Sequence, residues 1–162
     1  MSDALQELLE SLVAHNAWAD EKILAAADPL SDDDIGQKHG PDGVSIRRTL
    51  IHAVGTQLWW LSNWGVAPLK EYERERSAIR IAYDDAHAGL RTFVQSHRGE
   101  AWSQPITWSF PGGPPVTLPL CQTLVQVMEH SVQHRAETAT LLTALGRSPG
   151  DLDYIRFQLG DR

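Results

Sequence analysis

The chain has 162 residues, 42% of them apolar, and a formal net charge of −7, values typical of one globular domain spanning residues 1–162. This acidic balance argues against a nucleic-acid partner, because binding phosphates requires clustered Lys and Arg. The single cysteine, Cys121, excludes an internal disulfide, and no apolar run approaches the ~20 residues of a membrane span. Without a basic and apolar leader at the N-terminus, we expect a cytoplasmic protein with no membrane association.

Helical spacing of apolar residues predicts four long helices. The first covers residues 3–27, and the second begins at the N-cap Ser45 and ends near residue 64. The third is expected over residues 71–97 and the fourth over residues 119–145. The third helix carries a bundle seam of residues spaced four and three apart: Ile79, Tyr83, Ala86, Leu90 and Phe93.

Residues 99–119 interrupt the helical pattern. Residues 102–110 are rich in types that favour extended structure, and the turn-forming run PGGPP follows at 111–115. We expect a long loop with room for a small hairpin, and such loops are more often functional than idle. The tail after the fourth helix has apolar anchors that should dock on the bundle: Leu152, Tyr154, Ile155 and Phe157. The predicted fold class is therefore all-α, a four-helix bundle with a long loop before the last helix and a docked C-terminal tail.

His130 and His134 are the most informative residues of the chain. Four residues apart on a helix, their imidazoles lie on one face, one turn apart, and can point at one metal ion. A third histidine, His52, lies in the apolar segment of the second helix. Three neutral imidazoles on two facing helices would make an open metal site, with protein ligands on one side and water on the other.

The alternative is that these histidines only form hydrogen bonds inside the core. An unpaired polar group on a buried stripe costs about 1–3 kcal/mol, and a lone core histidine is usually satisfied by a neighbour. Two on one face, with His52 on another, favour a metal instead. The remaining histidines have weaker patterns: His15 and His39 read as ordinary residues, and Asp84 and His87 are placed to share a helix face. No Glu-x-x-His occurs, so a dinuclear carboxylate site is not expected.

Other side chains are candidates for the surroundings of the site. Glu137 lies three residues after His134 and is our candidate to accept a hydrogen bond from a ligand histidine or to take up a proton. Glu129 is expected to be a charged residue on the solvent face of the helix. Trp59 follows His52 by seven residues on the same helix and is a candidate to line a pocket.

Four short motifs, in this order, resemble the DinB/YfiT-like family of metal-dependent bundle proteins. HNAWAD at 15–20 is similar to the family pattern Tyr-Asn-x-Trp-Ala-Asn, and SIRRTLIH at 45–52, followed by Trp59 and Trp60, is similar to Ser-Ile-x-x-Thr-Leu-x-His…Trp. HSVQHR at 130–135 matches His-x-x-x-His-Arg, and PGDLDY at 149–154 resembles the closing Pro-x-x-Leu-Asp. The chain departs from the family after His-Arg, where Ala136-Glu137 replaces the usual Gly-Gln.

The resemblance implies a four-helix bundle, often a homodimer, whose divalent ion, zinc or nickel, is held by His52, His130 and His134. Glutamate in place of glutamine adds a carboxylate near these residues, as a base or a fourth ligand. Family relatives include thiol S-transferases and thiol-dependent isomerases, so the resemblance implies a small-molecule substrate and a low-molecular-weight thiol. Glu137 would then take the thiol proton, and the 99–119 loop would cover the site.

Two further functions stay open at this point. The same parts could activate water, which would make the protein a metal-dependent hydrolase. Alternatively, the protein binds a metal without catalysis, as a stress-response protein whose bundle needs the ion for stability.

Overall fold

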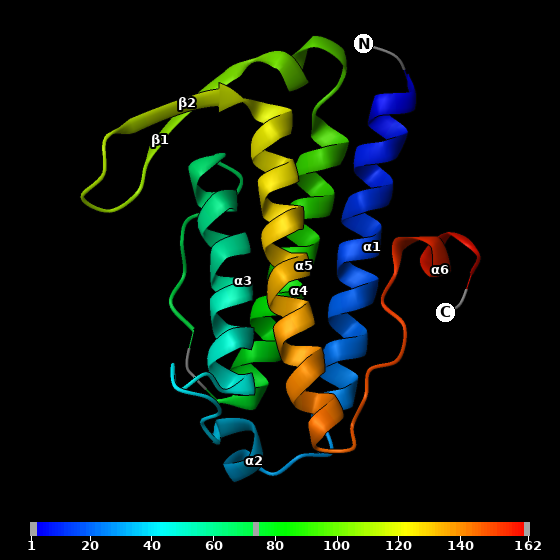
Figure 1. Cartoon of the computed structure of the whole chain (residues 1–162). Coiled ribbons are helices and arrows are strands. Elements are labelled where there is room, and N and C mark those ends of the chain that lie inside the picture. Colours follow the sequence, from blue (N-terminus) through cyan, green and yellow to red (C-terminus); the bar gives the residue numbers. More distant parts are fainter. Residues whose placement is uncertain (1–2, 73–74, 161–162) are drawn as a thin grey trace.

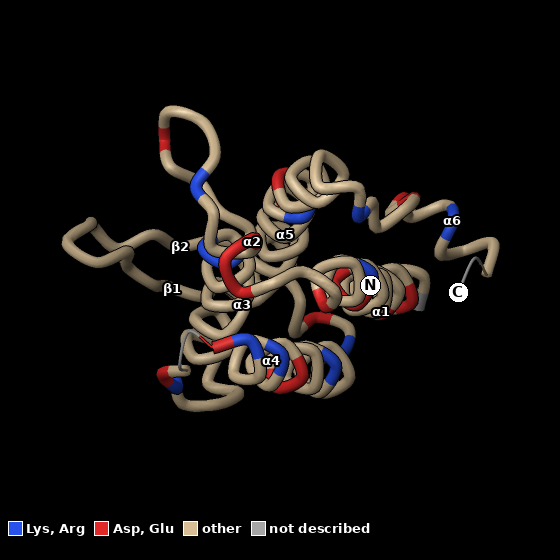
Figure 2. The backbone as a smooth tube through the Cα atoms, turned by 90° about the horizontal axis from the view of Figure 1, so that it is seen from below, with Lys and Arg blue, Asp and Glu red and all other residues tan. Residues whose placement is uncertain are grey.

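Four long helices form a bundle in the computed structural model, which describes residues 3–72 and 75–160 (Figure 1). They are α1 (Asp3–Ala27), α3 (Ile46–Asn63), α4 (Arg76–Ser96) and α5 (Leu120–Ala144). Both α1 and α3 pack against α4 and α5, so that the helices lie at the corners of a square when seen along their axes (Figure 2). The predicted all-α bundle is confirmed.

The order of the helices is not a simple up-and-down one. Helix α3 runs upward in Figure 1, the following residues 65–72 descend along the outside of the bundle, and α4 then runs upward again. Helices α3 and α4 are therefore parallel neighbours, joined by a crossover. A short helix, α2 (Asp32–Gly36), closes the lower end with a capping box between Ser31 and Asp34.

Two apolar clusters form the core, one at each end of the bundle. Trp60, Phe93 and Leu124 belong to the upper cluster, and Ile23 and Ile46 belong to the lower cluster. All five residues of the seam predicted on α4 are buried: Ile79, Tyr83, Ala86, Leu90 and Phe93. The seam therefore packs inward along its whole length, as a 4-3 spacing requires.

Helix α4 begins five residues later than expected. The predicted start at residue 71 is wrong, because the chain is not helical at Glu71 and Tyr72, and residues 73–74 lie outside the described part. The Tyr72 hydroxyl donates to the Asp85 carboxylate at 2.7 Å, and the Lys70 ammonium contacts the same carboxylate at 3.0 Å. These two bonds hold the preceding segment against the side of α4 instead of letting it extend the helix.

The region predicted as a long loop has its own structure. A 3₁₀ turn, η1 (Gly99–Ser103), leads into the antiparallel strands β1 (Pro105–Ser109) and β2 (Pro115–Pro119), in which Thr107 faces Thr117. Trp108 from β1 packs edge-on against Trp60 of α3, with ring centroids 4.9 Å apart. The hairpin is thereby attached to the upper end of the bundle.

The C-terminal tail docks on α1, as predicted. The Tyr154 hydroxyl, in α6 (Tyr154–Gln158), donates to Ser11 Oγ at 2.8 Å, and Lys22 Nζ donates to the carbonyl of Asp151 at 2.9 Å. One expected anchor is wrong: Ile155 is 60% exposed, because its side of the single-turn α6 faces away from α1. No helix in the described ranges is both long and apolar enough to pass through a membrane.

Candidate metal centre

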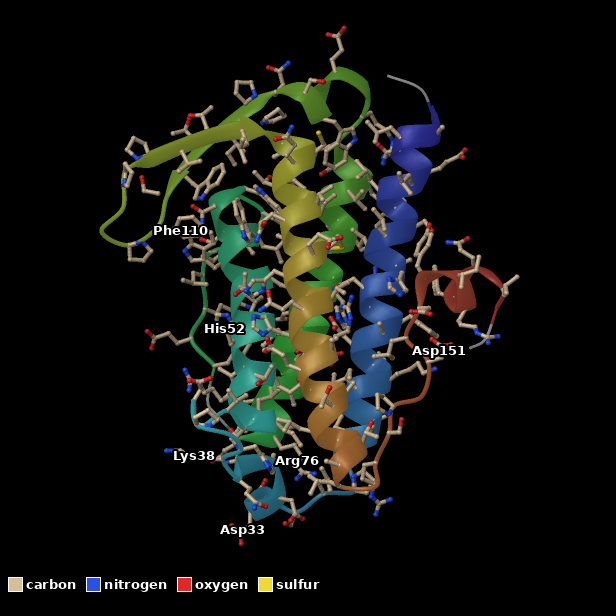
Figure 3. All side chains as sticks on the ribbon, viewed as in Figure 1. Asp33, Lys38, His52, Arg76, Phe110 and Asp151 are labelled. Carbon is tan, nitrogen blue, oxygen red and sulfur yellow. The ribbon has the colours of Figure 1, made fainter. Side chains whose placement is uncertain are left out.

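The structure brings the three predicted histidines together. Neighbouring helices supply them, His52 from α3 and His130 and His134 from α5, and the three potential donor atoms lie within 4.8 Å of one another. The Nε2 atoms of His130 and His134 are 3.2 Å apart, and the His52 ring centroid is 4.6 Å from that of His134. Figure 3 shows His52 near mid-height of the bundle. Within the described part of the chain, no other group of potential ligands converges in this way.

The donor set fits a divalent ion. In a tetrahedral zinc site, Zn–N distances of about 2.0–2.1 Å place two ligand nitrogens about 3.3 Å apart. The observed 3.2 Å between the two Nε2 atoms matches this edge length. His52 is the most exposed of the three, and the largest separation among the three donor atoms is within 4.8 Å. Three imidazoles leave one or more coordination positions open, as in catalytic sites, and do not choose between zinc and nickel.

The imidazoles are held in the neutral form that binds metals. Burial, together with the neighbouring His134 and His52, lowers the pKa of His130 to about 4. Burial and His134 also lower the pKa of His52 below its ordinary value. Both rings therefore present an unprotonated nitrogen at neutral pH without first losing a proton to solvent.

Glu137 lies behind His134, on the side away from the converging nitrogens. Because an ionised carboxylate can only accept, Nδ1–H of His134 donates to Glu137 Oε2, at 2.7 Å. The neutral ring then has no proton on Nε2, whose lone pair can bind a metal. Burial raises the pKa of Glu137, but hydrogen bonds from Gln133 and His134 outweigh it and hold the pKa below the usual range. Glu137 is thus an ionised carboxylate that accepts from His134, and it is not one of the three converging ligands.

His130 lacks such a partner. Its Nδ1 is buried and has no hydrogen bond among the described residues. Its ring contacts the other two histidine rings, with centroids 5.1 Å from His52 and 4.4 Å from His134, and its Nε2 lies 3.2 Å from His134 Nε2.

A cavity of about 1030 Å³ opens beside the histidines. His52 and His130 line it, together with Arg48, Trp59 and Phe110. The predicted place of Trp59 in a pocket wall is therefore correct, and the hairpin contributes Phe110 at the upper end. A ligand in this cavity would reach the open side of the three-histidine cluster.

A buried polar network behind the site was missed by the sequence analysis. It joins all four long helices, and its members are between 1% and 7% exposed: Asn16, Asp20, Gln57, His87 and Arg135. Asp20 receives hydrogen bonds from Arg135 Nη1 at 2.9 Å and from His87 Nε2 at 3.0 Å. Asp84 and His87 do not share a face as expected, because Asp84 is exposed to solvent while His87 is buried. The available signal was the i, i+4 spacing of Asn16 and Asp20 on the inner face of α1.

The remaining histidines are outside the cluster and have local roles. His15 Nε2 donates to the carbonyl of Leu152 at 2.9 Å and so helps to dock the tail. His97 Nδ1 donates to the carbonyl of Phe93 at 2.8 Å, at the end of α4. The backbone of His39 pairs with Val44 in an isolated bridge.

The fold and the histidine cluster define a helical-bundle protein with a potential three-histidine metal site. The model of the DinB family matches residues 1–161, and the chain belongs to this family. A search of curated proteins finds no match.

Two solved structures have the same fold. One is YfiT from Bacillus subtilis, described as a probable metal-dependent hydrolase with an unusual four-helix bundle topology; it is 12% identical, with a TM-score of 0.68 over 91% of each chain. The other is a DinB-like protein from Bacillus cereus ATCC 10987, 19% identical, with a TM-score of 0.63 over 82% of this chain and 89% of that one. At these identities the likeness extends to the fold alone.

Proposed function

We propose that this protein is a metal-dependent enzyme that joins a low-molecular-weight thiol to a small electrophilic substrate. His52, His130 and His134 would hold the ion, zinc or nickel. The observation that carries the proposal is the convergence of three imidazole nitrogens within 4.8 Å of one another, two of the three rings lining a cavity of about 1030 Å³. A site that only stabilised the bundle would not need an open side toward such a space.

A divalent ion, when bound, lowers the pKa of a thiol or water in its open position, so that a nucleophile exists at neutral pH. The chain's own residues prepare the site for this chemistry. Glu137 holds His134 in the tautomer that presents Nε2. Glu137 is ionised and 42% of its side chain is exposed, so it is also our candidate for taking up the thiol proton; because it lies on the far side of the His134 ring, the proton would reach it through water.

In the transfer itself, sulfur would form a bond to an electrophilic carbon of the substrate. The electron pair of the carbon's bond to its leaving group would depart with that group, and the thiol proton would go to Glu137 or to solvent. No oxidant or reductant is needed. The cavity beside His52 and His130 is large enough to hold both reactants, because drug-sized ligands occupy cavities of roughly 300–1,000 Å³.

Hydrolysis is the second candidate, and the description of YfiT as a probable metal-dependent hydrolase favours it. Water would take the place of the thiol, and the same residues would orient it. Binding of a metal without catalysis is the third outcome that the experiments below distinguish.

The first test is the metal content of protein purified without an affinity tag, measured by elemental analysis. We expect about one divalent ion per chain, and His134→Ala should lower this well below one, since it removes one of three ligands. His97→Ala is the matched control, because His97 lies at the end of α4 outside the cluster and should leave the metal content unchanged. Full occupancy in His134→Ala would overturn the assignment.

The second test separates the reactions. The protein is incubated with a thiol and 1-chloro-2,4-dinitrobenzene, and separately with an activated ester, each with and without a chelator. Chelator-sensitive conjugation supports thiol transfer, and chelator-sensitive ester cleavage without conjugation supports hydrolysis. Metal-loaded protein that does neither, with any thiol or ester tried, would favour the binding role.

A further inference from the structure

One face of α3 presents four residues to the cavity in a single row. Arg48, His52, Gly55 and Trp59 follow one another at spacings of four, three and four, which places them on one side of a helix, and all four line the cavity. At a rise of 1.5 Å per residue, Arg48 lies about 6 Å below His52 along the axis and Trp59 about 10 Å above it. The proposed metal ligand is thus between a cation and an aromatic ring.

More basic than acidic residues line the lower end of the cavity. Three basic residues line it, and Arg47 is already paired with Asp32 at 3.1 Å. The side chains of Arg48 and Lys38 have no carboxylate partner among the described residues. The Arg48 guanidinium donates to the backbone carbonyl of Asp42, at 3.4 Å. Lys38, Arg47 and Arg48 thus face two carboxylates, Asp42 in the lining and Asp32 paired with Arg47. These five residues carry one net positive charge, and Asp33 and Asp34 lie next to Asp32 on α2.

The position of this charge is visible in the views of the whole chain. Figure 2 shows basic segments at the start of α3 and in the loop before it. Figure 3 shows Lys38 below His52 on the same side of the bundle. The charge of Arg48 also contributes to the lowered pKa of His52, but its effect is smaller than those of burial, of His134 and of the opposing Glu137 carboxylate.

The upper end of the cavity is a flat apolar wall. Trp59 and Phe110 are stacked, with ring centroids 5.6 Å apart and planes 8° from parallel, and Phe110 is 55% exposed although it is large and apolar. Figure 3 shows Phe110 above His52, on the side where Lys38 lies below it. An exposed aromatic pair of this kind is a surface on which an apolar or aromatic group can pack.

Gly55 keeps the middle of the row open. A Cβ built at this position meets no atom within 4 Å, so close packing does not require glycine here. Glycine in a helix interior costs about 1 kcal/mol relative to alanine. Any side chain at this position would extend into the cavity between His52 and Trp59 and would occupy the space of a ligand.

We propose that this site binds an elongated organic anion, with its carboxylate at Arg48 and its apolar or aromatic end against Trp59 and Phe110. The atom that reacts would then lie between the two ends, beside His52. This placement of the reacting atom rests on the proposed function, whereas the two-ended binding does not. Lys38 strengthens the attraction for the carboxylate without contacting it in a fixed geometry.

The test compares two probes of equal length, 6-phenylhexanoate and the neutral 6-phenylhexanamide. Their affinities are measured by calorimetry on chelator-treated protein, so that coordination of the carboxylate by a metal cannot contribute. We expect the acid to bind at least tenfold more tightly than the amide, and this ratio to fall with added salt. Equal affinities, or no binding of the acid at millimolar concentration, would overturn the proposal.

Two variants assign the two ends. Arg48→Gln should reduce the acid-to-amide ratio to near one and leave the affinity for the amide unchanged. Arg91→Gln, which changes an exposed arginine of α4, is the matched control and should keep the wild-type ratio. Gly55→Leu should weaken both probes at least tenfold, because a Cβ at this position has open space around it and the longer side chain would occupy the part of the cavity between His52 and Trp59. A wild-type ratio in Arg48→Gln, or undiminished binding in Gly55→Leu, would contradict the assignment.

The metal content of the same preparations, measured before chelation, keeps the two proposals apart. Arg48→Gln and Gly55→Leu leave all three histidines in place, so both variants should retain the wild-type stoichiometry. Protein without metal that still prefers the acid would refute the proposed function and support the anion site. Protein with metal and no such preference would do the reverse.

Discussion

Replacing Arg135 by methionine should destabilise the fold strongly. The Arg135 side chain is 6% exposed, and its Nη1 donates to Asn16 Oδ1 at 2.6 Å and to Asp20 Oδ1 at 2.9 Å. Removing one partner of a buried ion pair leaves an uncompensated charge and costs about 3–5 kcal/mol. Because Asp20 still receives hydrogen bonds from Gln57 and His87, we expect the lower end of this range, about 3 kcal/mol.

The assay is urea unfolding followed by tryptophan fluorescence. With an m-value of about 2 kcal/mol/M for a protein of this size, a loss of about 3 kcal/mol lowers the midpoint by about 1.5 M. Arg91→Met is the control for losing a surface arginine and should change stability by less than about 0.5 kcal/mol. In the double variant with Asp20→Leu, the loss should be smaller than the sum of the two single losses, because no lone charge remains.

The stability of Arg135→Met and of the double variant shows whether Arg135 and Asp20 act as an ion pair. A loss below about 1 kcal/mol in Arg135→Met, with an unchanged m-value, would mean that the charge of Asp20 is compensated without Arg135. Additive losses in the double variant would likewise show that the two residues do not interact. In both cases the buried network would be a collection of independent polar groups and not an ion pair that joins α1 to α5.

Three other predictions concern the site and the tail. Glu137→Ala should weaken metal binding about tenfold to a hundredfold, because it removes the acceptor of His134 Nδ1–H. Glu137→Gln keeps an acceptor oxygen and should bind the metal nearly as tightly as wild type, as should the control Glu129→Ala. A competitive chelator titration measures all three affinities. Burial lowers the pKa of His15 below 6.5 in the folded protein. The stabilisation from the neutral His15 ring is therefore complete above about pH 6.5 and is lost as the pH falls. The urea midpoint should drop between pH 8 and pH 5, and it should drop less in His15→Gln. Gly55→Ala should raise the unfolding free energy by up to about 1 kcal/mol in the same assay, and a loss of stability would show that the position is packed after all.

Local patterns in the sequence were sufficient to predict the helices and one pair of site residues. Ser45 caps α3 as expected, with its Oγ accepting from the backbone N–H of Arg48, because capping depends on residues only three apart. His130 and His134 had to share a face for the same reason, since a helical turn fixes the relation between positions four apart. The apolar segment around His52 made it the candidate third ligand, and the resemblance to known motifs added the family, which is confirmed by the match over residues 1–161.

Contacts between distant segments were decided only by the tertiary structure. Whether His52 faces the pair depends on how α3 is rotated against α5, and the partner of His87 proved to be Asp20, 67 residues away, and not its neighbour Asp84. The start of α4 moved because Tyr72, which the sequence pattern placed inside the helix, bonds instead to the side chain of Asp85 on α4. Periodicity shows which face of a helix is buried, whereas the choice of partner for that face is made by the packing of all four helices at once.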